Sequence, residues 1–347
     1  MNNFYLPAEW YPQDAVLMTW PHAATDWQPL LEKVEPAFIN IAKAITDRQK
    51  LIINCHNENL QQHIKAIFKQ ANIKLEQVNF VLTASNDTWA RDHGPITLVN
   101  HEGKIKCLNF IFNGWGNKFE ASLDNQLNLA LFQQLKLTEQ QQQSINLVLE
   151  GGGIESDGQG HLLTTSKCLL NPNRNPALTK QDIETQLCSL FASKKVLWLD
   201  SGDLIGDDTD AHIDTLCRFA PNNSLVYVRC DDENDAHFAE LAEMEKELQA
   251  LRTLDNQTFN LIPLPWPSAK FNQDGDRLPA TYANYLIINQ AVLVPTYQDK
   301  ADETALRQIQ LAYPEHEVIA IDCLAVIEQF GSLHCLTMQL PKGVLPA

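Results

Sequence analysis

The stretch FGSLHCLTMQLP, residues 330–341, decides the fold because of its place in the chain. Leu and Met alternate in it with Ser, Thr and Gln, a pattern of period two that predicts a β-strand with one buried face. This strand begins a structural unit that the six residues after it are too few to complete. The remainder of that unit must therefore come from elsewhere in the sequence.

Four units with the order strand, strand, helix, strand precede this stretch, beginning near residue 95. A hairpin signal, His101-Glu102-Gly103, separates the first two strands of the first unit. The strands read, in order, PITLVN, KIKCLNF and INLVLE; GIESDG, HLLTTS and KVLWLD; HIDTLCRF, SLVYVRC and FNLIPLP; and YANYLIIN, AVLVPTY and EVIAID. The helices are expected near 121–136, 179–192, 233–251 and 301–312.

The N-terminal segment supplies what the fifth unit lacks. It reads as a strand (AVLMTW), a helix near 29–47 and a second strand (KLIINC), with a further helix near 58–70 and strand VNFVL as an elaboration. Five similar units joined through the two ends of the chain form a ring, which removes exposed sheet edges. We therefore expect one α/β domain, residues 1–347, of repeated ββαβ units. An open α/β sheet with ordinary crossovers is the alternative.

Composition narrows the functional classes. The formal net charge of −17 argues against nucleic-acid binding, which requires a basic surface. No segment approaches the roughly 20 apolar residues of a membrane span, and the N-terminus does not read as a signal peptide. The eight cysteines lie singly, without the C-x-x-C spacing of zinc knuckles. These features lead us to expect a reduced, cytoplasmic protein.

Two polar stretches interrupt the strands early in the chain. NDTWARDHGP, residues 86–95, combines Trp89 with the carboxylate of Asp92 in a loop, where short acids also make ordinary turn hydrogen bonds. In LVLEGGGIESDGQG, residues 147–160, Glu150 ends a buried strand before three glycines, which let backbone approach a ligand closely. A bulged turn with a solvated Glu150 fits that second pattern equally well.

A third stretch, GDDTDAHIDTLCRF at 206–219, brings a histidine next to carboxylates. On a strand beginning near Ala211, His212 and Asp214 would be two residues apart and face the same side. The pair suits divalent metal ions, and His212 alone suits general acid–base catalysis. A purely structural role is the alternative, in which the acids cap a helix and the histidine is hydrogen-bonded. The apolar strand that follows weakens this alternative.

Cys335 lies in the stretch that decides the fold. In strand register it shares a face with Leu333 and Thr337, whereas His334 faces the other way and would be a poor partner. By itself the thiol fits a structural role better than a reactive one. With His212 and the carboxylates it forms a reactive set. Carboxylates would raise the pKa of a thiol, so their presence makes sense for a cationic substrate such as a planar guanidinium, whose carbon is an electrophile.

Seven motifs in this order resemble those of the agmatine deiminases, in the peptidyl-arginine deiminase-like family of the guanidine-modifying (pentein) superfamily. They are LPAEWYPQDAVLMTWP, DTWARDHGP, LEGGGIESDGQG, LLNPNRNP, GDDTDAHID, PATYANYLIIN and LHCLTMQ. The resemblance implies a five-bladed, pseudo-symmetric α/β propeller. It also implies hydrolysis of agmatine to N-carbamoylputrescine and ammonia, a step in polyamine and putrescine biosynthesis, without a metal or organic cofactor.

The resemblance further implies a role for each candidate site residue. Cys335 would be the nucleophile that forms a covalent S-alkylthiouronium, and His212 the general acid and base. Asp92 and Asp214 would hold the guanidinium nitrogens. Glu150 would pair with the guanidinium and orient His212, and Trp89 would line the pocket.

Several alternatives remain open from the sequence. A deiminase of arginine or peptidyl-arginine is one alternative; free arginine would need a basic partner for its α-carboxylate, and Arg91 and Arg218 lie within the matched motifs. A metal-dependent amidohydrolase could use the same acids and His212 as ligands. A polyamine-binding protein would hold the cation without turning it over. The expected partner is a small guanidine, with no nucleic acid and no membrane, and a homo-oligomer is compatible with the resemblance.

Overall fold

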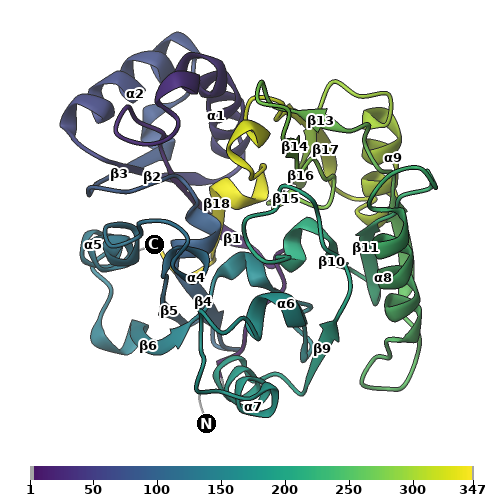
Figure 1. Cartoon of the computed structure of the whole chain (residues 1–347). Helices are drawn as coiled ribbons and strands as arrows, with labels where there is room; N and C mark the ends of the chain where they lie inside the picture. Colours follow the sequence, from purple (N-terminus) through teal and green to yellow (C-terminus); the bar gives the residue numbers. More distant parts are fainter. Residues whose placement is uncertain (1–3, 346–347) are drawn as a thin grey trace.

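The computed structural model describes residues 4–345 and has a mixed α/β fold (Figure 1). Five of its sheets share one design, in which a central strand pairs antiparallel with one neighbour and parallel with the other. The sheets are β18-β1-β2-β3, β4-β5-β6, β7-β8-β9, β10-β11-β12 and β15-β16-β17, beside a small β13-β14 hairpin. Within residues 4–345, no helix combines the length and apolar character needed to cross a bilayer.

The strands follow the sequence-based expectation closely along the whole chain. They are β1 (Gln13–Thr19), β2 (Lys50–Cys55), β3 (Val78–Leu82), β4 (Ile96–Val99), β5 (Ile105–Ile111), β6 (Gln142–Val148), β7 (Ile154–Ser156), β8 (His161–Thr165), β9 (Lys195–Leu199), β10 (Cys217–Ala220), β11 (Ser224–Val228), β12 (Asn260–Leu264), β13 (Lys270–Phe271), β14 (Arg277–Leu278), β15 (Leu286–Ile288), β16 (Ala291–Thr296), β17 (Glu317–Asp322) and β18 (Thr337–Pro341).

The longer helices connect the second and third strands of each sheet, and α2 connects β2 to β3. They are α1 (Leu31–Thr46), α2 (Glu58–Gln70), α5 (Leu127–Gln134), α7 (Lys180–Phe191), α8 (Phe238–Ala250) and α9 (Asp302–Ala312). Local sequence explains the starts of two of them, α2 and α7. Asn57 caps α2 by accepting a hydrogen bond from the Leu60 amide at 3.0 Å, and Thr179 forms a capping box with Asp182 at α7. Each cap satisfies amide groups that have no partner within the helix.

Burial explains why these elements pack where they do. In α1, Val34, Phe38, Ile41 and Ile45 recur at helical spacing and are fully buried, which places one apolar stripe against the sheet. Every residue of β11 is buried, as expected for a central strand covered on both faces. The core consists of three clusters: a large one, a second that joins β4–β6 to β7–β9, and a third that joins the sheet of β1 and β18 to β4 and β5.

The two ends of the chain meet in one sheet, as the sequence predicts. β1 pairs antiparallel with β18, with Val16 opposite Gln339 and Met18 opposite Thr337. β1 also pairs in parallel with β2, so the unit begun by β18 is completed by N-terminal residues. Figure 1 shows the yellow β18 beside the purple β1.

Three expected strands begin later than predicted: β15 begins at Leu286 and not near Tyr282, and the other two corrections concern candidate site residues. Residues 213–215 form a 3₁₀ turn, η6 (Ile213–Thr215), so His212 and Asp214 lie ahead of β10 and not on it. Cys335 lies in a second 3₁₀ turn, η8 (His334–Leu336), and the strand starts only at Thr337. The physical reason is that polar side chains hydrogen-bond to the backbone of both segments and hold it in a turn.

Candidate active site

Five short segments carry the candidate site, and each one immediately precedes the first strand of one of the five sheets. The helix α3 (Ala90–His93) precedes β4, the turn η5 (Gly151–Gly153) precedes β7, and η6 precedes β10. The segment 280–285 precedes β15, and η8 precedes β18. The turns η5 and η8 both pack against α3, and η6 packs against η5. The repeated units thus bring residues far apart in sequence to one place.

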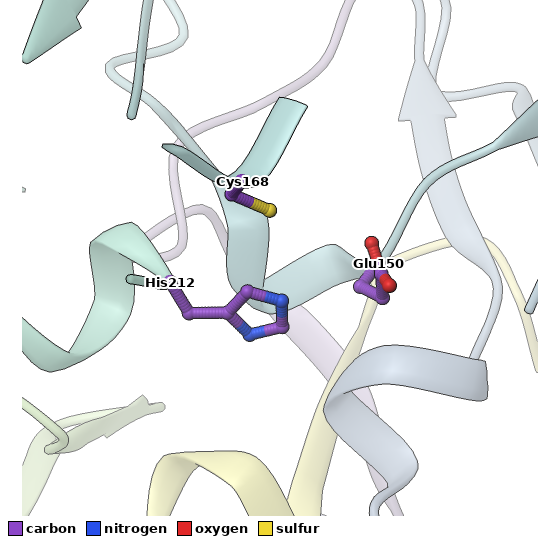
Figure 2. Close-up of side chains that lie close together, drawn as sticks. All are labelled: Glu150, Cys168 and His212. Carbon is purple, nitrogen blue, oxygen red and sulfur yellow. The ribbon is translucent and has the colours of Figure 1, made fainter. Parts of the chain in front are cut away.

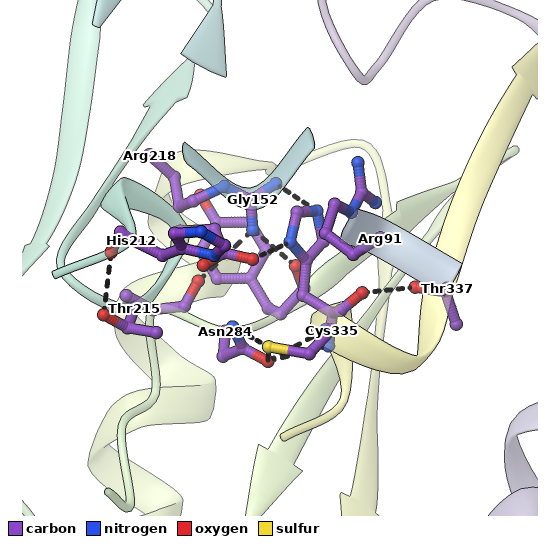
Figure 3. A network of polar contacts seen from close by, with 12 residues as sticks. Arg91, Gly152, His212, Thr215, Arg218, Asn284, Cys335 and Thr337 are labelled. Atoms are coloured by element: carbon purple, nitrogen blue, oxygen red, sulfur yellow. Dashed lines mark hydrogen bonds and ion pairs between the residues drawn. The ribbon is translucent and has the colours of Figure 1, made fainter. Parts of the chain in front are cut away.

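Cys335 lies against the side chain of Asn284, from the segment before β15 (Figure 3). Its Sγ is 3.3 Å from Asn284 Nδ2 and 3.4 Å from Oδ1. The thiol is 4 % exposed. Burial raises its pKa well above the ordinary cysteine value, and the charges of Asp214 and Asp92 raise it further. In the unliganded protein Cys335 is therefore a neutral thiol near pH 7.

His212 is fully buried beside three groups that favour its charged form. Its Nδ1 lies 3.5 Å from Asp92 Oδ1, and neither ring nitrogen has a hydrogen-bond partner among the described residues. Burial alone would lower the pKa of His212, but Asp92, Cys168 and Glu150 together raise it to about 10. His212 is therefore an imidazolium that can give up a proton.

Asp92 and Asp214 face His212 from two different segments. Asp92 accepts hydrogen bonds from Trp115 Nε1 at 3.0 Å and from the Gly152 amide at 3.2 Å. Burial raises its pKa to about 6, although the charge of His212 opposes this shift. Asp214 accepts from His334 Nδ1 at 2.7 Å through Oδ2, whereas its Oδ1 has no partner within residues 4–345. Burial would raise the pKa of Asp214, but His334 lowers it.

A buried ion network lies beside the site, and Figure 3 labels two of its members, Arg91 and Arg218. His334 Nε2 lies 2.7 Å from Glu9 Oε2, and Arg218 donates to the same oxygen at 2.7 Å. Arg218 also donates to Glu155, and Arg91 lies 3.6 Å from Glu9. Burial would raise the pKa of Glu9, but His334, Arg218 and Arg91 hold it well below its usual range. The network links the N-terminal segment to the residue next to Cys335.

Glu150 is held by an arginine of this chain. Arg174 Nε donates to both Glu150 oxygens, at 2.9 and 3.0 Å, and Arg174 Nη1 donates to Asp210 at 2.7 Å. The pair fixes the carboxylate just after β6, where the glycine turn η5 begins; the prediction that Glu150 ends a buried strand was wrong, because β6 is a largely exposed strand at the edge of its sheet. It also lies beside His212, whose pKa Glu150 helps to raise.

Two groups of side chains have a spacing that could accommodate a metal ion. Ligand atoms of Glu150, Cys168 and His212 all lie within 4.8 Å of one another (Figure 2). A second group contains Glu9, Glu155 and His334. In both, however, an arginine already neutralises the carboxylates, Arg174 in the first and Arg218 in the second. A divalent cation would lie close to a guanidinium charge, so this arrangement favours ion pairing within the chain.

Cys335, Asp92 and Trp89 line a cavity of about 290 Å³. Its wall carries four aspartates and four aromatic rings: Asp26, Asp87, Asp92, Asp208, Trp89, Trp115, Phe119 and Phe330. Among the described residues that line it there is no Lys or Arg. His212, Glu150 and Asp214 are fully buried and do not line it. A Cβ at Gly331 would lie 2.2 Å from Trp89 Cζ3, so glycine is needed there for the ring to form the wall.

The structure brings all six predicted site residues into this region and adds others. Sequence reasoning did not identify Asn284, Trp115, Arg174 or Glu9. For Asn284 the sequence did contain a clue, which was its position. It lies in the motif PATYANYLIIN and in the fourth of the five segments that precede a first strand. The strand register expected at His334 and Cys335 was wrong, because both lie in the turn η8, and the His334 ring contacts Asp214 and Glu9. The His334 backbone amide and that of Cys335 both donate to Asn284 Oδ1, which bends the chain into a turn.

Comparison with known proteins identifies the family of this chain. Residues 5–341 match the model of the Porphyromonas-type peptidyl-arginine deiminase family. The agmatine deiminase of Pseudomonas syringae pv. tomato is 32 % identical over 361 residues, covering 98 % of this chain and 96 % of the relative. The chain belongs to the Porphyromonas-type peptidyl-arginine deiminase family.

Solved structures give the same family. A C. jejuni agmatine deiminase with substrate bound is 37 % identical, with a TM-score of 0.90 over 99 % of this chain and 98 % of that one. A Porphyromonas gingivalis protein provisionally named an arginine deiminase is 44 % identical, with a TM-score of 0.89 over 98 % of this chain and 99 % of that one. These relatives act, by name, on two guanidines with different tails.

Proposed function

We propose that this protein is an agmatine deiminase that hydrolyses agmatine to N-carbamoylputrescine and ammonia. The observation that carries the proposal is the aspartate-lined cavity that opens onto Cys335. Agmatine has a positive charge at each end, so a wall with four carboxylates and no basic side chain among its described residues suits it along its whole length. The family match and the names of several relatives support the same reaction.

The guanidinium would bind between Asp92 and Asp214. Asp214 has one oxygen committed to His334 and the other, Oδ1, without a partner among the described residues. Asp92 lies 3.5 Å from His212 and lines the cavity itself. Glu150 accepts hydrogen bonds from Arg174 through both oxygens. We therefore propose that Glu150 positions His212 and favours its protonated form, and that it is not the main contact of the substrate. Trp89 would stack against the chain of the substrate.

The chemistry follows from the charges of the resting site. Cys335 begins as a thiol and His212 as an imidazolium, so the bound cation must supply the positive charge that favours loss of the thiol proton to water. The thiolate attacks the guanidinium carbon, and His212 protonates the departing nitrogen, which leaves as ammonia. The S-alkylthiouronium remains. Neutral His212 then takes a proton from water, and the hydroxide adds to the same carbon. The C–S bond breaks with its electron pair on sulfur, and the proton of the added hydroxyl passes to that sulfur, which releases the ureido product and restores the thiol and the imidazolium.

The tail of the substrate distinguishes agmatine from arginine. Free arginine would place its α-carboxylate among aspartates, where like charges repel. Arg91 and Arg218, the candidate partners for such a carboxylate, are buried in ion pairs with Glu9 and do not line the cavity. Arginine or peptidyl-arginine remains the alternative substrate, because one similar structure is provisionally named an arginine deiminase.

We also propose a finer architecture. The five sheets would be the blades of a five-bladed α/β propeller, a single catalytic domain of residues 1–347. The pairing of β1 with β18 and the placement of one site segment before each sheet support this arrangement. A cytoplasmic enzyme that acts on a small molecule, as a homo-oligomer or alone, is consistent with the proposed substrate.

The deciding experiment is turnover in the presence of EDTA. Wild type, Cys335→Ala and Cys107→Ala would be incubated with agmatine, with arginine and with a blocked arginine peptide, while ammonia and ureido product are measured. We expect agmatine turnover by wild type and Cys107→Ala and none by Cys335→Ala. Cys107 is the matched control, a buried thiol in β5 that accepts from Thr97.

Each other outcome identifies a different protein. Preferential turnover of arginine or of the peptide would replace agmatine as the substrate. Activity that EDTA abolishes and a metal restores would indicate a metal-dependent amidohydrolase. Binding of agmatine without any turnover would indicate a polyamine-binding protein. An active Cys335→Ala variant would rule out this thiol as the nucleophile.

A further inference from the structure

The Asn284 side chain contacts both the sulfur of Cys335 and the backbone that carries it. Asn284 is fully buried in the segment that precedes β15. Its Oδ1 accepts from the His334 amide at 2.9 Å and from the Cys335 amide at 3.3 Å. Its Nδ2 lies 3.3 Å from Cys335 Sγ. One side chain from a distant segment thus fixes the turn and contacts the reacting atom (Figure 3).

The two backbone amides determine which way the Asn284 amide points. Backbone N–H groups only donate, so the atom that faces both of them must be the oxygen. The NH₂ group is then the end that faces the sulfur. Because Oδ1 already accepts two hydrogen bonds, a third from the thiol proton adds little, although Oδ1 lies 3.4 Å from Sγ. The free capacity of this amide is on its donor side, which suits a thiolate better than a thiol.

The backbone on either side of Asn284 is also held in place. Arg218 Nη1 donates to the Tyr285 carbonyl at 2.6 Å and to the Ala283 carbonyl at 3.3 Å. The same arginine pairs with Glu9 and Glu155. The amide donor is therefore preorganised, which is the condition under which a hydrogen bond stabilises a developing charge most strongly.

We propose that Asn284 is a catalytic residue whose Nδ2–H donates to the Cys335 thiolate and stabilises it during attack and release. The inference rests on the proposed role of Cys335 as nucleophile and extends it. A buried thiolate among Asp92 and Asp214 needs donors to offset its charge, and besides the substrate cation it has the backbone of Ser332 and the side chain of Asn284. The hydrogen bond from Asn284 acts in the opposite direction to these aspartates and lowers the pKa of Cys335.

The test replaces the Nδ2 donor of Asn284 and keeps its Oδ1 acceptor. Asn284→Asp preserves size and the oxygen that receives the two backbone amides, but it presents a carboxylate oxygen to the sulfur. The pKa of Cys335 is read from its rate of alkylation by iodoacetamide across pH, with the modified Cys335 peptide quantified by mass spectrometry. The same substitution at Asn54, a buried amide that donates to the Thr83 carbonyl at 3.1 Å, is the matched control. Thermal unfolding checks that each variant is folded.

A hydrogen bond to a charged group sets the expected size of the effect. We expect the alkylation pKa of Cys335 to rise by about one to two units in Asn284→Asp, and kcat/KM at neutral pH to fall about 10- to 100-fold. KM for agmatine should change little, and Asn54→Asp should leave the alkylation profile of Cys335 unmoved. A folded Asn284→Asp variant with the wild-type profile would overturn the proposal.

Two further measurements keep the test decisive. Asn284→Ala, which adds no charge, replaces the aspartate variant if the latter unfolds, and the same upward shift is expected. In wild type, the side-chain amide protons of Asn284 should titrate with the alkylation pKa of Cys335, and a flat titration would contradict the contact. Alkylation needs no turnover, so a shifted profile in a protein that does not deiminate agmatine would refute the proposed function and leave this inference standing.

Discussion

Gly152 occupies the point where three candidate site residues converge, so the smallest added side chain should disrupt catalysis. A Cβ at this position would lie 2.6 Å from His212 Nδ1, 2.8 Å from Asp92 Oδ1 and 3.2 Å from Asp214 Oδ2. The backbone of Gly152 does not have the positive φ that disfavours alanine. Gly152→Ala therefore acts by crowding and not by backbone strain.

The size of the effect follows from these distances. Ordinary van der Waals contact begins at 3.4 Å, so His212 Nδ1 must move by 0.8 Å (3.4 less 2.6) and Asp92 Oδ1 by 0.6 Å (3.4 less 2.8). Both side chains are buried and cannot move freely into solvent. Misplacement of catalytic groups by about 1 Å costs on the order of 100-fold in rate. Overpacking costs about 1–3 kcal/mol of stability, which the protein should survive folded.

The assay compares kcat/KM for agmatine in wild type, Gly152→Ala and Gly153→Ala. Gly153 is the matched control, because its added Cβ would lie 3.1 Å from Cys168 Sγ and 3.8 Å from His212 Cδ2. We expect a loss of about 100-fold for Gly152→Ala and a much smaller loss for Gly153→Ala. Circular dichroism and thermal unfolding would show that both variants retain the fold.

One pattern of results would refute this reasoning. If the two variants lost activity equally, the crowding of His212 and Asp92 would not be the cause. Full activity in Gly152→Ala would show that these two residues can shift without consequence, and their assigned roles would have to be withdrawn.

Two further predictions concern charges. The pKa of Asp92 is about 6, so its ionised fraction falls as pH drops below that value. Trp115→Phe removes the indole donor of Asp92 and should move the acidic limb of the pH profile of kcat/KM upward by about one pH unit. An unmoved acidic limb would show that Asp92 is not the group that titrates there. Glu9→Gln removes one of the two buried carboxylates that pair with Arg218, and the one that faces Arg91, and should cost about 3–5 kcal/mol in urea unfolding at neutral pH. Because the folded-state pKa of Glu9 is depressed, its charge stabilises the fold at pH values above the ordinary pKa of glutamate, and this stabilisation is lost as the pH falls. If Glu9→Gln lowered the free energy of unfolding equally at pH 7 and in acid, the assignment would be contradicted.

The fold could be predicted largely because its signals are local. Period-two strands and helical stripes recur in the expected order, and the pairing of β1 with β18 followed from an unfinished last unit. Helix starts were less predictable. α8 begins at Phe238 and not near 233, because Asp232 and Asp235 accept hydrogen bonds from the amides of Asn234 and His237 and hold that segment in turns.

The site was harder to predict because long-range contacts shape its turns. The sequence pattern predicts His212 on a strand, but Asp210 and Ala211 have positive φ values of 66° and 65°, and Asp207 and Thr209 accept from the amides of Ala211 and His212. No propensity rule indicates such a conformation for alanine, which rarely has positive φ.

The turn at Cys335 was equally hidden from local reasoning. It depends on Asn284, about 50 residues earlier in the chain, whose oxygen accepts the two consecutive amides. The same residues fit either a strand or a turn held by a distant side chain, and only the position of Asn284 in the fold distinguishes the two. The buried ion pairs of Arg174 and Arg218 were unpredictable for the same reason.

The sheet that joins the two ends of the chain has a consequence for biosynthesis. β18 is the last of the described strands to leave the ribosome, and it brings Cys335 with it. Until then the edge of β1 that β18 covers has no partner from this chain, and an open edge can pair with a neighbouring nascent chain. A truncated translation product would lack Cys335, the proposed nucleophile, and would also expose that edge. In this topology, completing the last strand both completes the candidate active site and covers an open strand edge.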